Sequence, residues 1–176
     1  KKYILLMFEW LNNGDLQEAV ALRHPYFERQ GIPECSISWN DVILASFAEP
    51  EFLGKGGFVD EKTLAPGCVR AFAEEVNRLY PSRTGDVSIH MYGSFIKEAN
   101  TNGKHRDTAN VFLIGALGTT DYTIFNDEDT AQVNYTVGPG DVLYIPRSRW
   151  HLPEPLEPRA VFSIGLEYGR HVDDDG

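Results

Sequence analysis

Two histidines and one aspartate are the residues of this sequence whose types and spacing best suit metal chemistry. His105 and Asp107 form an H-x-D pattern just after a turn signal at residues 101–103, and His151 follows further along the chain. In an extended strand, residues i and i+2 point to the same side, so His105 and Asp107 can face one metal ion. His151 is the best candidate for a third ligand. Two histidines and one carboxylate on one face of an octahedron leave positions open for other ligands, as in Fe(II) oxygenases.

The H-x-D pattern has little specificity by itself. With five histidines and 26 acidic residues in the chain, such a tripeptide has roughly an even chance of arising at random. Residues 171–173 are in fact a second copy, which we interpret as part of an acidic tail because no strand follows it. The first copy differs in its context, since His105 precedes the apolar run Val111–Ile114. This context favours the first copy as the metal-binding one.

The elements that must position these residues change type near the middle of the chain. Residues 1–85 are predicted to be helical, because their apolar residues recur at helical spacing between capping and proline signals. The signals are, in chain order, a run after Asn13 that reaches Phe27 but is broken by Pro25, a Ser38–Asp41 capping box, a glycine-rich loop at residues 54–57, and a helix between Pro66 and Pro81.

Residues 86–170 show a period of two, which is typical of strands. The predicted strands are Val87–Tyr92, Asn110–Leu117, Tyr122–Phe125, Val133–Val137, Val142–Ile145 and Ala160–Tyr168. Tight-turn signals separate them. Short strands after helices predict a mostly β fold with N-terminal helices (α+β), in which a compact barrel or jelly roll carries helices on one sheet. We expect a single domain over residues 1–176, with an acidic tail at 171–176.

Charge and composition narrow the classes of partner. The formal net charge is −10, which repels phosphate backbones and anionic membranes, so nucleic acid is an unlikely partner. No apolar run has the length needed to cross a bilayer. Cys35 and Cys68 have no metal-ligand spacing; a disulfide between them is possible, but two isolated cysteines also fit a reduced, cytoplasmic protein. We therefore expect a cytoplasmic protein that acts on a small molecule or a protein side chain.

A family resemblance follows from the order of the motifs. H-x-D at residues 105–107, a short β-rich interval, G-D-V-L-Y-I-P at residues 140–146 and W-H at residues 150–151 together resemble the double-stranded β-helix of the cupin-like, JmjC-like dioxygenases that depend on 2-oxoglutarate and Fe(II). The resemblance covers roughly residues 86–168. It implies that His105, Asp107 and His151 bind Fe(II), with 2-oxoglutarate as cosubstrate.

The resemblance also implies a basic residue for the far carboxylate of 2-oxoglutarate. In one branch this residue is an arginine that opens the final strand, and Arg159 stands eight residues after His151. A guanidinium fork suits a carboxylate well. The JmjC-like branch uses a lysine on the strand after H-x-D, and residues 118–122 contain none. Secondary candidates for hydrogen bonds to the cosubstrate are Tyr92, Asn110, Thr120 and Ser163.

The function implied is that of an oxidoreductase that hydroxylates a C–H bond, with no catalytic residue beyond the metal ligands. Two alternatives remain open from the sequence. The first is a cupin metalloenzyme without 2-oxoglutarate, such as an isomerase or a direct dioxygenase, which a further histidine beside the metal, above all His90, would favour. The second is a non-catalytic cupin-like binding module. An Arg159 that points away from the metal would weaken the cosubstrate assignment.

Overall fold

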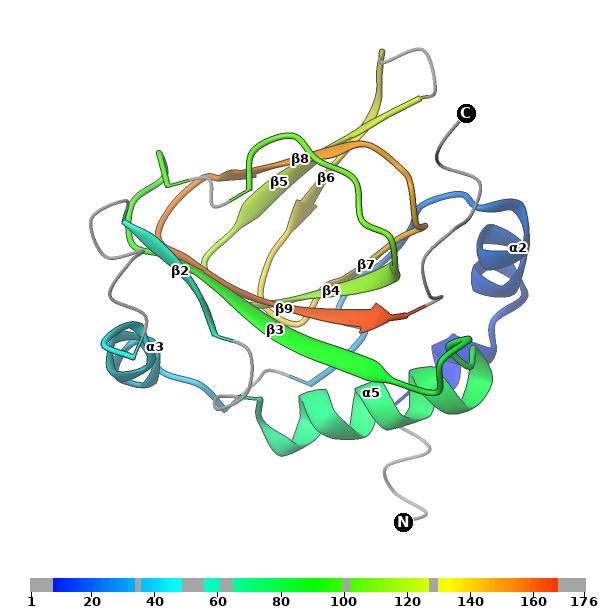
Figure 1. Ribbon diagram of the computed structural model, residues 1–176, viewed down its shortest axis with the longest axis horizontal. Helices are drawn as coiled ribbons and strands as arrows, with labels where there is room; N and C mark the ends of the chain where they lie inside the picture. Colours follow the sequence, from blue (N-terminus) through cyan, green and yellow to red (C-terminus); the bar gives the residue numbers. More distant parts are fainter. Residues whose placement is uncertain are drawn as a thin grey trace.

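The computed structural model of the chain describes residues 8–33, 36–48, 56–60, 65–99, 102–126 and 130–167. Two antiparallel sheets enclose the interior, and α5 lies across the outer face of the larger sheet (Figure 1). The helices are η1 (Glu9–Asn12), α2 (Gly14–Leu22), α3 (Trp39–Ser46) and α5 (Gly67–Leu79). The strands are β1 (Tyr26–Glu28), β2 (Gly57–Asp60), β3 (Val87–Ser94), β4 (Asn110–Leu117), β5 (Thr120–Phe125), β6 (Ala131–Val137), β7 (Val142–Ile145), β8 (His151–Pro155) and β9 (Arg159–Leu166).

The strand order is that of a jelly roll. The larger sheet runs β1-β7-β4-β9-β3-β2, and the smaller sheet runs β6-β5-β8. The predicted bounds of β4 and β7 are confirmed, and β3, β5, β6 and β9 lie where strands were predicted. The fold class predicted from the sequence, a mostly β jelly-roll core with helices packed on one sheet, is therefore confirmed.

β8 is the strand of the core that the sequence did not predict. Its sequence, HLPEP, contains Pro153 and Pro155, and a proline cannot donate to a sheet ladder, so two of them argue against a strand. The structure accommodates them because β8 pairs with β5 on one side and forms an edge of the smaller sheet. This strand begins at His151, so the missed element is the one that carries a candidate ligand.

The prediction of a wholly helical first half was incomplete. The helix after Asn13 ends at Leu22, where Arg23 takes a left-handed conformation with φ of 56°, and Phe27 belongs to β1, opposite Leu143 of β7. β2 likewise pairs with β3, so Gly57 begins a strand instead of closing a loop. These two strands extend the larger sheet at both edges and have only three and four residues, too few to show a period.

The helix signals in the first half predicted real helices. Ser38 and Asp41 form the expected capping box, in which the Ser38 hydroxyl accepts a hydrogen bond from the Asp41 N–H and the Asp41 carboxylate accepts one from the Ser38 N–H. α5 ends at Leu79, two residues before Pro81. The buried residues of α5 are Val69, Phe72, Ala73 and Val76, which is one helical face. That face packs on the larger sheet.

The larger sheet separates two apolar clusters. The outer cluster lies between the sheet and the helices and includes Phe72, Phe112 and Phe162. The inner cluster lies between the two sheets and includes Val111 and Val161. Alternate residues of each strand therefore serve different clusters.

Several sequence predictions fall outside the described residues. They concern Cys35, and hence the possible disulfide, and the acidic tail with the second H-x-D copy. Among the helices that the structure describes, none has the length and apolarity that a membrane-spanning helix requires.

Candidate metal centre

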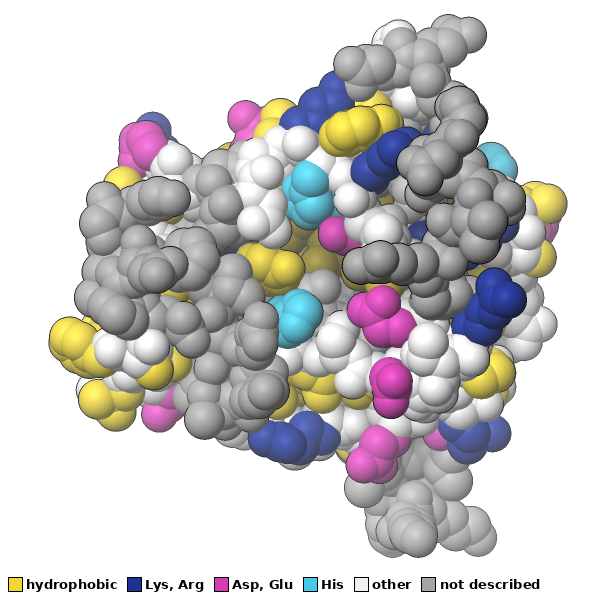
Figure 2. All heavy atoms as spheres, viewed as in Figure 1, with side chains coloured by type: hydrophobic (Ala, Val, Ile, Leu, Met, Phe, Trp, Pro, Cys, Tyr) yellow, Lys and Arg dark blue, Asp and Glu magenta, His cyan; other side chains and the backbone are white. Residues whose placement is uncertain are grey.

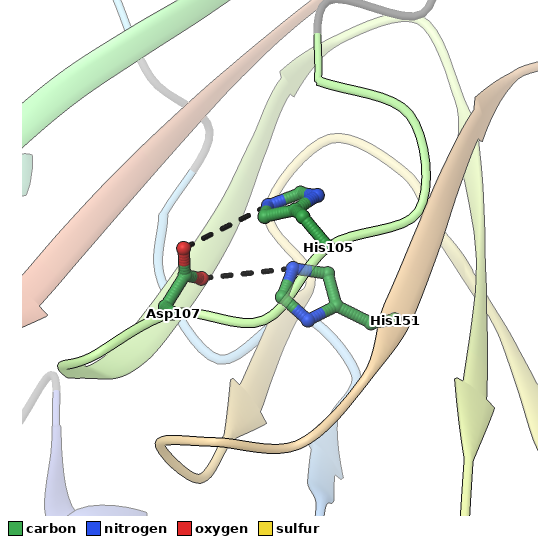
Figure 3. Close-up of side chains that lie close together, drawn as sticks. All are labelled: His105, Asp107 and His151. Atoms are coloured by element: carbon green, nitrogen blue, oxygen red, sulfur yellow. Dashed lines mark ion pairs between the residues drawn. The ribbon is translucent and has the colours of Figure 1, made fainter. Parts of the chain in front are cut away.

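His105, Asp107 and His151 lie together, and their side chains point toward one another (Figure 3). The Nε2 atom of His105 is 3.7 Å from Oδ1 of Asp107, and Nε2 of His151 is 3.6 Å from Oδ2 of the same carboxylate. One ligand atom from each residue lies within 4.8 Å of the others. Ligands of one ion at bond lengths near 2 Å are separated by about 3 Å in an octahedral site, so a small closure completes the geometry.

The backbone brings the two histidines together in a way that the sequence did not predict. His105 was expected in a strand, but it lies in a loop and forms an isolated bridge with His151, the first residue of β8. Each of these residues donates its backbone N–H to the carbonyl of the other at 2.9 Å. Asp107 is anchored separately, since its carbonyl accepts a hydrogen bond from the Ser148 N–H at 2.7 Å. Backbone pairing therefore replaces strand alternation as the positioning device.

Hydrogen bonds fix which ring nitrogen faces the centre. Nδ1 of His105 lies 2.9 Å from the Gly103 carbonyl, and Nδ1 of His151 lies 3.0 Å from the Arg149 carbonyl. A carbonyl can only accept, so each Nδ1 must carry the proton in these contacts. In the neutral rings, both Nε2 atoms then present a lone pair toward Asp107. This is the outer-shell arrangement that orients histidines at metal sites.

The electrostatics of the cluster favour neutral imidazole at His151. That side chain is 3% exposed, whereas those of His105 and Asp107 are 25% and 35% exposed. Burial lowers the pKa of His151, and the neighbouring His105 lowers it further, while the hydrogen bond to Arg149 and the charge of Asp107 act in the opposite direction. A lowered pKa keeps the ring neutral at pH 7, which is the state that binds a metal.

A pocket between the two sheets opens at this cluster. About 320 Å³ of space there is not filled by atoms, part of it open to solvent. Figure 2 shows this face of the molecule hollowed near its centre, with histidine and acidic side chains beside the hollow. The lining residues are Tyr92, Asn102, His105, Asp107, Leu113, Tyr122, His151, Pro153, Arg159 and Ser163.

Arg159 is the principal cation of this pocket. It opens β9 on the inner face, and it is 1% exposed. Its Nε is buried and has no hydrogen-bond partner among the residues that the structure describes. A buried guanidinium with an unused donor is costly unless an anion meets it. Both the inward orientation and the unused donor fit a carboxylate ligand.

Tyr122 is a pocket residue that sequence reasoning did not single out. Its side chain is buried and lines the pocket together with Arg159. Burial raises the pKa of Tyr122, against the opposing influence of the Arg159 charge and hydrogen bond, so the phenol is protonated at neutral pH and can donate to an anion. Strand alternation from Thr120 would have placed it inward, but a strand tyrosine is ordinarily read as packing.

The remaining candidates divide into two groups. Tyr92 and Ser163 line the pocket, as does Asn102, which had been considered only as part of a turn. Thr120 is fully buried on the inner face, and its hydroxyl has no hydrogen-bond partner among the described residues, but it does not line the pocket. Asn110 does not line the pocket; its side-chain oxygen accepts a hydrogen bond from the Arg147 N–H at 2.9 Å.

His90, the residue that would have favoured an ordinary cupin, is not part of the cluster. Among the described residues, the group able to hold a metal contains His105, Asp107 and His151 alone. His90 lies on β3 opposite Ser163 and stacks edge-on against Tyr92, with 6.5 Å between ring centroids. The structure thus offers a three-residue ligand set with no fourth side chain from the described part of the chain.

A jelly roll with two histidines and one carboxylate at a pocket between its sheets defines the class of cupin-like metal-dependent oxygenases. Residues 77–173, more than half of the chain, match the JmjC domain family, and the chain belongs to that family. The resemblance inferred from the motifs is therefore confirmed at the level of the superfamily, whose cofactors are Fe(II) and 2-oxoglutarate. No curated protein matches the chain in sequence.

Solved structures from Escherichia coli share the fold. YcfD is 17% identical, with a TM-score of 0.68 over 91% of this chain and 54% of its own. YcfD described as a ribosomal oxygenase, in complex with cobalt and 2-oxoglutarate, is 16% identical, with a TM-score of 0.61 over 90% of this chain and 53% of its own. The chain thus spans about half the length of these proteins. At this identity, the likeness establishes the fold alone.

Proposed function

We propose that this protein is an Fe(II)- and 2-oxoglutarate-dependent oxygenase that hydroxylates its substrate, with His105, Asp107 and His151 as the iron ligands. One observation carries the proposal. Three ligand atoms of the type that Fe(II) oxygenases use converge at the mouth of a pocket, and the same pocket holds a buried arginine with an unused donor.

The ligands have distinct tasks in this proposal. The two imidazole rings supply neutral Nε2 donors, held in place by backbone carbonyls at Nδ1. Asp107 supplies an anionic oxygen that offsets part of the metal charge. Fe(II) bound there supplies the oxidising chemistry, which couples the oxidative decarboxylation of 2-oxoglutarate to oxidation of a substrate C–H bond.

Arg159 and Tyr122 hold the cosubstrate in this proposal. The guanidinium meets the far carboxylate of 2-oxoglutarate through its unused Nε–H, and the Tyr122 hydroxyl adds a second donor. Ser163 lines the same pocket and is placed to add a hydroxyl. The carboxylate would thereby satisfy a buried donor for which the described part of the chain supplies no partner.

The lining also limits the access of water. Leu113 and Pro153 contribute apolar surface beside the ligands, and an apolar wall strengthens every electrostatic contact made within the pocket. Asp107 is the most exposed of the three ligands, at 35%, so a substrate can approach the centre from its side. We propose a protein side chain or a small molecule as that substrate; a protein substrate is supported by the fold shared with a ribosomal oxygenase, and a cytoplasmic location would agree with it.

Turnover of 2-oxoglutarate tests this proposal without knowledge of the substrate, because such enzymes decarboxylate it slowly on their own. Succinate would be measured in air with Fe(II) and ascorbate. We expect succinate from the wild type and at least a hundredfold less from Asp107→Ala, while Asp86→Ala, an exposed carboxylate remote from the site, behaves as the wild type. Equal rates in all three proteins would contradict the proposal.

A further inference from the structure

Two of the three proposed ligands lie on a loop that has little support from a sheet. Residues 102–109 precede β4, and their bridge to β8 is confined to His105. Besides that bridge, the carbonyl of Asp107 accepts a hydrogen bond from the Ser148 N–H. A loop that aims two side chains at one position is favoured by further contacts, because ordering it costs conformational entropy.

The side chains between the ligands supply such contacts. Nζ of Lys104 lies 3.8 Å from the centroid of the Phe125 ring and 5.9 Å from that of Trp150. The guanidinium carbon of Arg106 lies 5.4 Å from the Trp150 ring. Cations at these distances over aromatic faces are attracted by the ring quadrupole. We call Lys104, Arg106, Phe125 and Trp150 the cation–aromatic clamp.

The clamp connects the loop to the strand that supplies the third ligand. Trp150 directly precedes His151, and the Phe125 N–H donates to the Trp150 carbonyl at 2.9 Å. Both residues therefore lie at the end of the β5–β8 ladder, next to His151. The four clamp residues are not among those that line the pocket, and Trp150 contacts Lys104 and Arg106 of the loop. Figure 2 shows basic and hydrophobic side chains side by side next to a histidine on this face.

We propose that Lys104 and Arg106 are positioning residues that hold the H-x-D loop in its metal-binding conformation by stacking on Phe125 and Trp150. This inference rests on the proposed metal site. The clamp acts through the populations of loop conformations, because the apparent affinity for a metal falls in proportion to the fraction of molecules that are competent to bind it.

The sign of the effect separates positioning from simple electrostatics. Removing two positive charges near a bound dication strengthens its binding if charge alone matters. If the clamp positions the loop, its loss weakens metal binding instead. A variant that removes a ring and keeps both charges, Trp150→Leu, leaves the Coulomb energy unchanged and weakens binding only if the clamp matters.

Co(II) titration of the metal-free protein tests the clamp, with the Co(II) absorption spectrum as a second readout. We expect a Kd about tenfold higher for the double variant Lys104→Met/Arg106→Met and severalfold higher for Trp150→Leu. The spectrum at saturation should match the wild type, because the ligands are unchanged. Lys104→Arg keeps a cation over the ring and should retain the wild-type Kd. Lys97 is an exposed lysine outside the clamp, and Lys97→Met should also leave the Kd for Co(II) unaltered.

Unchanged or tighter Co(II) binding in the double variant would overturn the clamp, as would equal weakening in Lys97→Met. A double-mutant cycle gives an independent check: Lys104→Met should have little further effect in a Phe125→Leu background, and full additivity would contradict the proposed contact. Failure of the proposed function would look different. The wild type itself would then bind no Co(II), whereas failure of the clamp alone leaves wild-type binding intact.

Discussion

The two faces of the larger sheet bury different kinds of side chain, although the same strands form both. On β9, Phe162 and Ile164 face the helices within an apolar cluster, while Arg159 and Ser163 face the pocket. The outer face needs only to pack. The inner face carries Arg159, whose Nε has no hydrogen-bond partner among the described residues, and such a buried donor reduces stability unless a ligand meets it. Stability and proposed function can therefore be perturbed separately.

The largest effect is expected from removing an inner-face ligand. His105→Ala should lower Co(II) affinity and 2-oxoglutarate turnover by a factor of at least ~10³, because two ligands cannot replace three. The free energy of unfolding should change little, since the ring is partly exposed. Titration and chemical denaturation measure the two quantities. Wild-type affinity in the variant would remove His105 from the site.

On the outer face we expect the reverse: a substitution should lower stability and leave metal binding unchanged. Phe72→Ala should lower the free energy of unfolding by about 3–5 kcal/mol, because the ring is fully buried between Phe8 and Phe112. The folded fraction should bind Co(II) as the wild type does. Phe47, which is 67% exposed, is the matched control, and its replacement by alanine should cost little. A large loss of metal affinity in folded Phe72→Ala would show that packing on the outer face also determines metal binding, which would contradict the separation of the two faces.

Arg159→Met tests the inner face of β9, the strand whose outer face packs against the helices. We expect the Kd for 2-oxoglutarate to rise about 100-fold, because a buried charge-assisted hydrogen bond is lost. Co(II) affinity in the absence of 2-oxoglutarate should stay the same. Stability should be unchanged or higher, since methionine removes the buried donor that has no partner. Calorimetry measures the two affinities, and chemical denaturation measures the free energy of unfolding. A strongly destabilised variant with normal 2-oxoglutarate binding would mean that Arg159 stabilises the fold and does not bind the cosubstrate.

The smallest effect is expected at Tyr122. Tyr122→Phe keeps the ring and removes one donor, so the Kd for 2-oxoglutarate should rise about five- to tenfold. Isothermal titration of the metal-loaded protein in the absence of oxygen measures it. An unchanged Kd would mean that the hydroxyl serves Arg159 alone and does not contact the cosubstrate.

The sequence predicted those features that depend on pattern and missed those that depend on pairing. β4 and β7 were predicted with the correct bounds because they are apolar runs between turns. β8 was missed because its prolines are acceptable only at a sheet edge, which no local pattern reveals. The short β1 and β2 were missed because three and four residues show no period, and their pairing with β7 and β3 is not visible in the local sequence.

The candidate site shows the same division. The chemical types and the approach of His105, Asp107 and His151 could be predicted, but the expected strand geometry was wrong. The histidines meet through a backbone bridge between a loop and a strand, which is a tertiary pairing. Tyr122 was missed because its importance comes from Arg159, a residue distant in sequence that reaches it only in the fold.

Anaerobic titration of the metal-free protein with Fe(II) and 2-oxoglutarate tests the central claim most directly. The account predicts a visible charge-transfer band that saturates at one equivalent of iron, that requires 2-oxoglutarate, and that is absent in His105→Ala. A well-folded wild type that binds iron and shows no such band on addition of 2-oxoglutarate would contradict it.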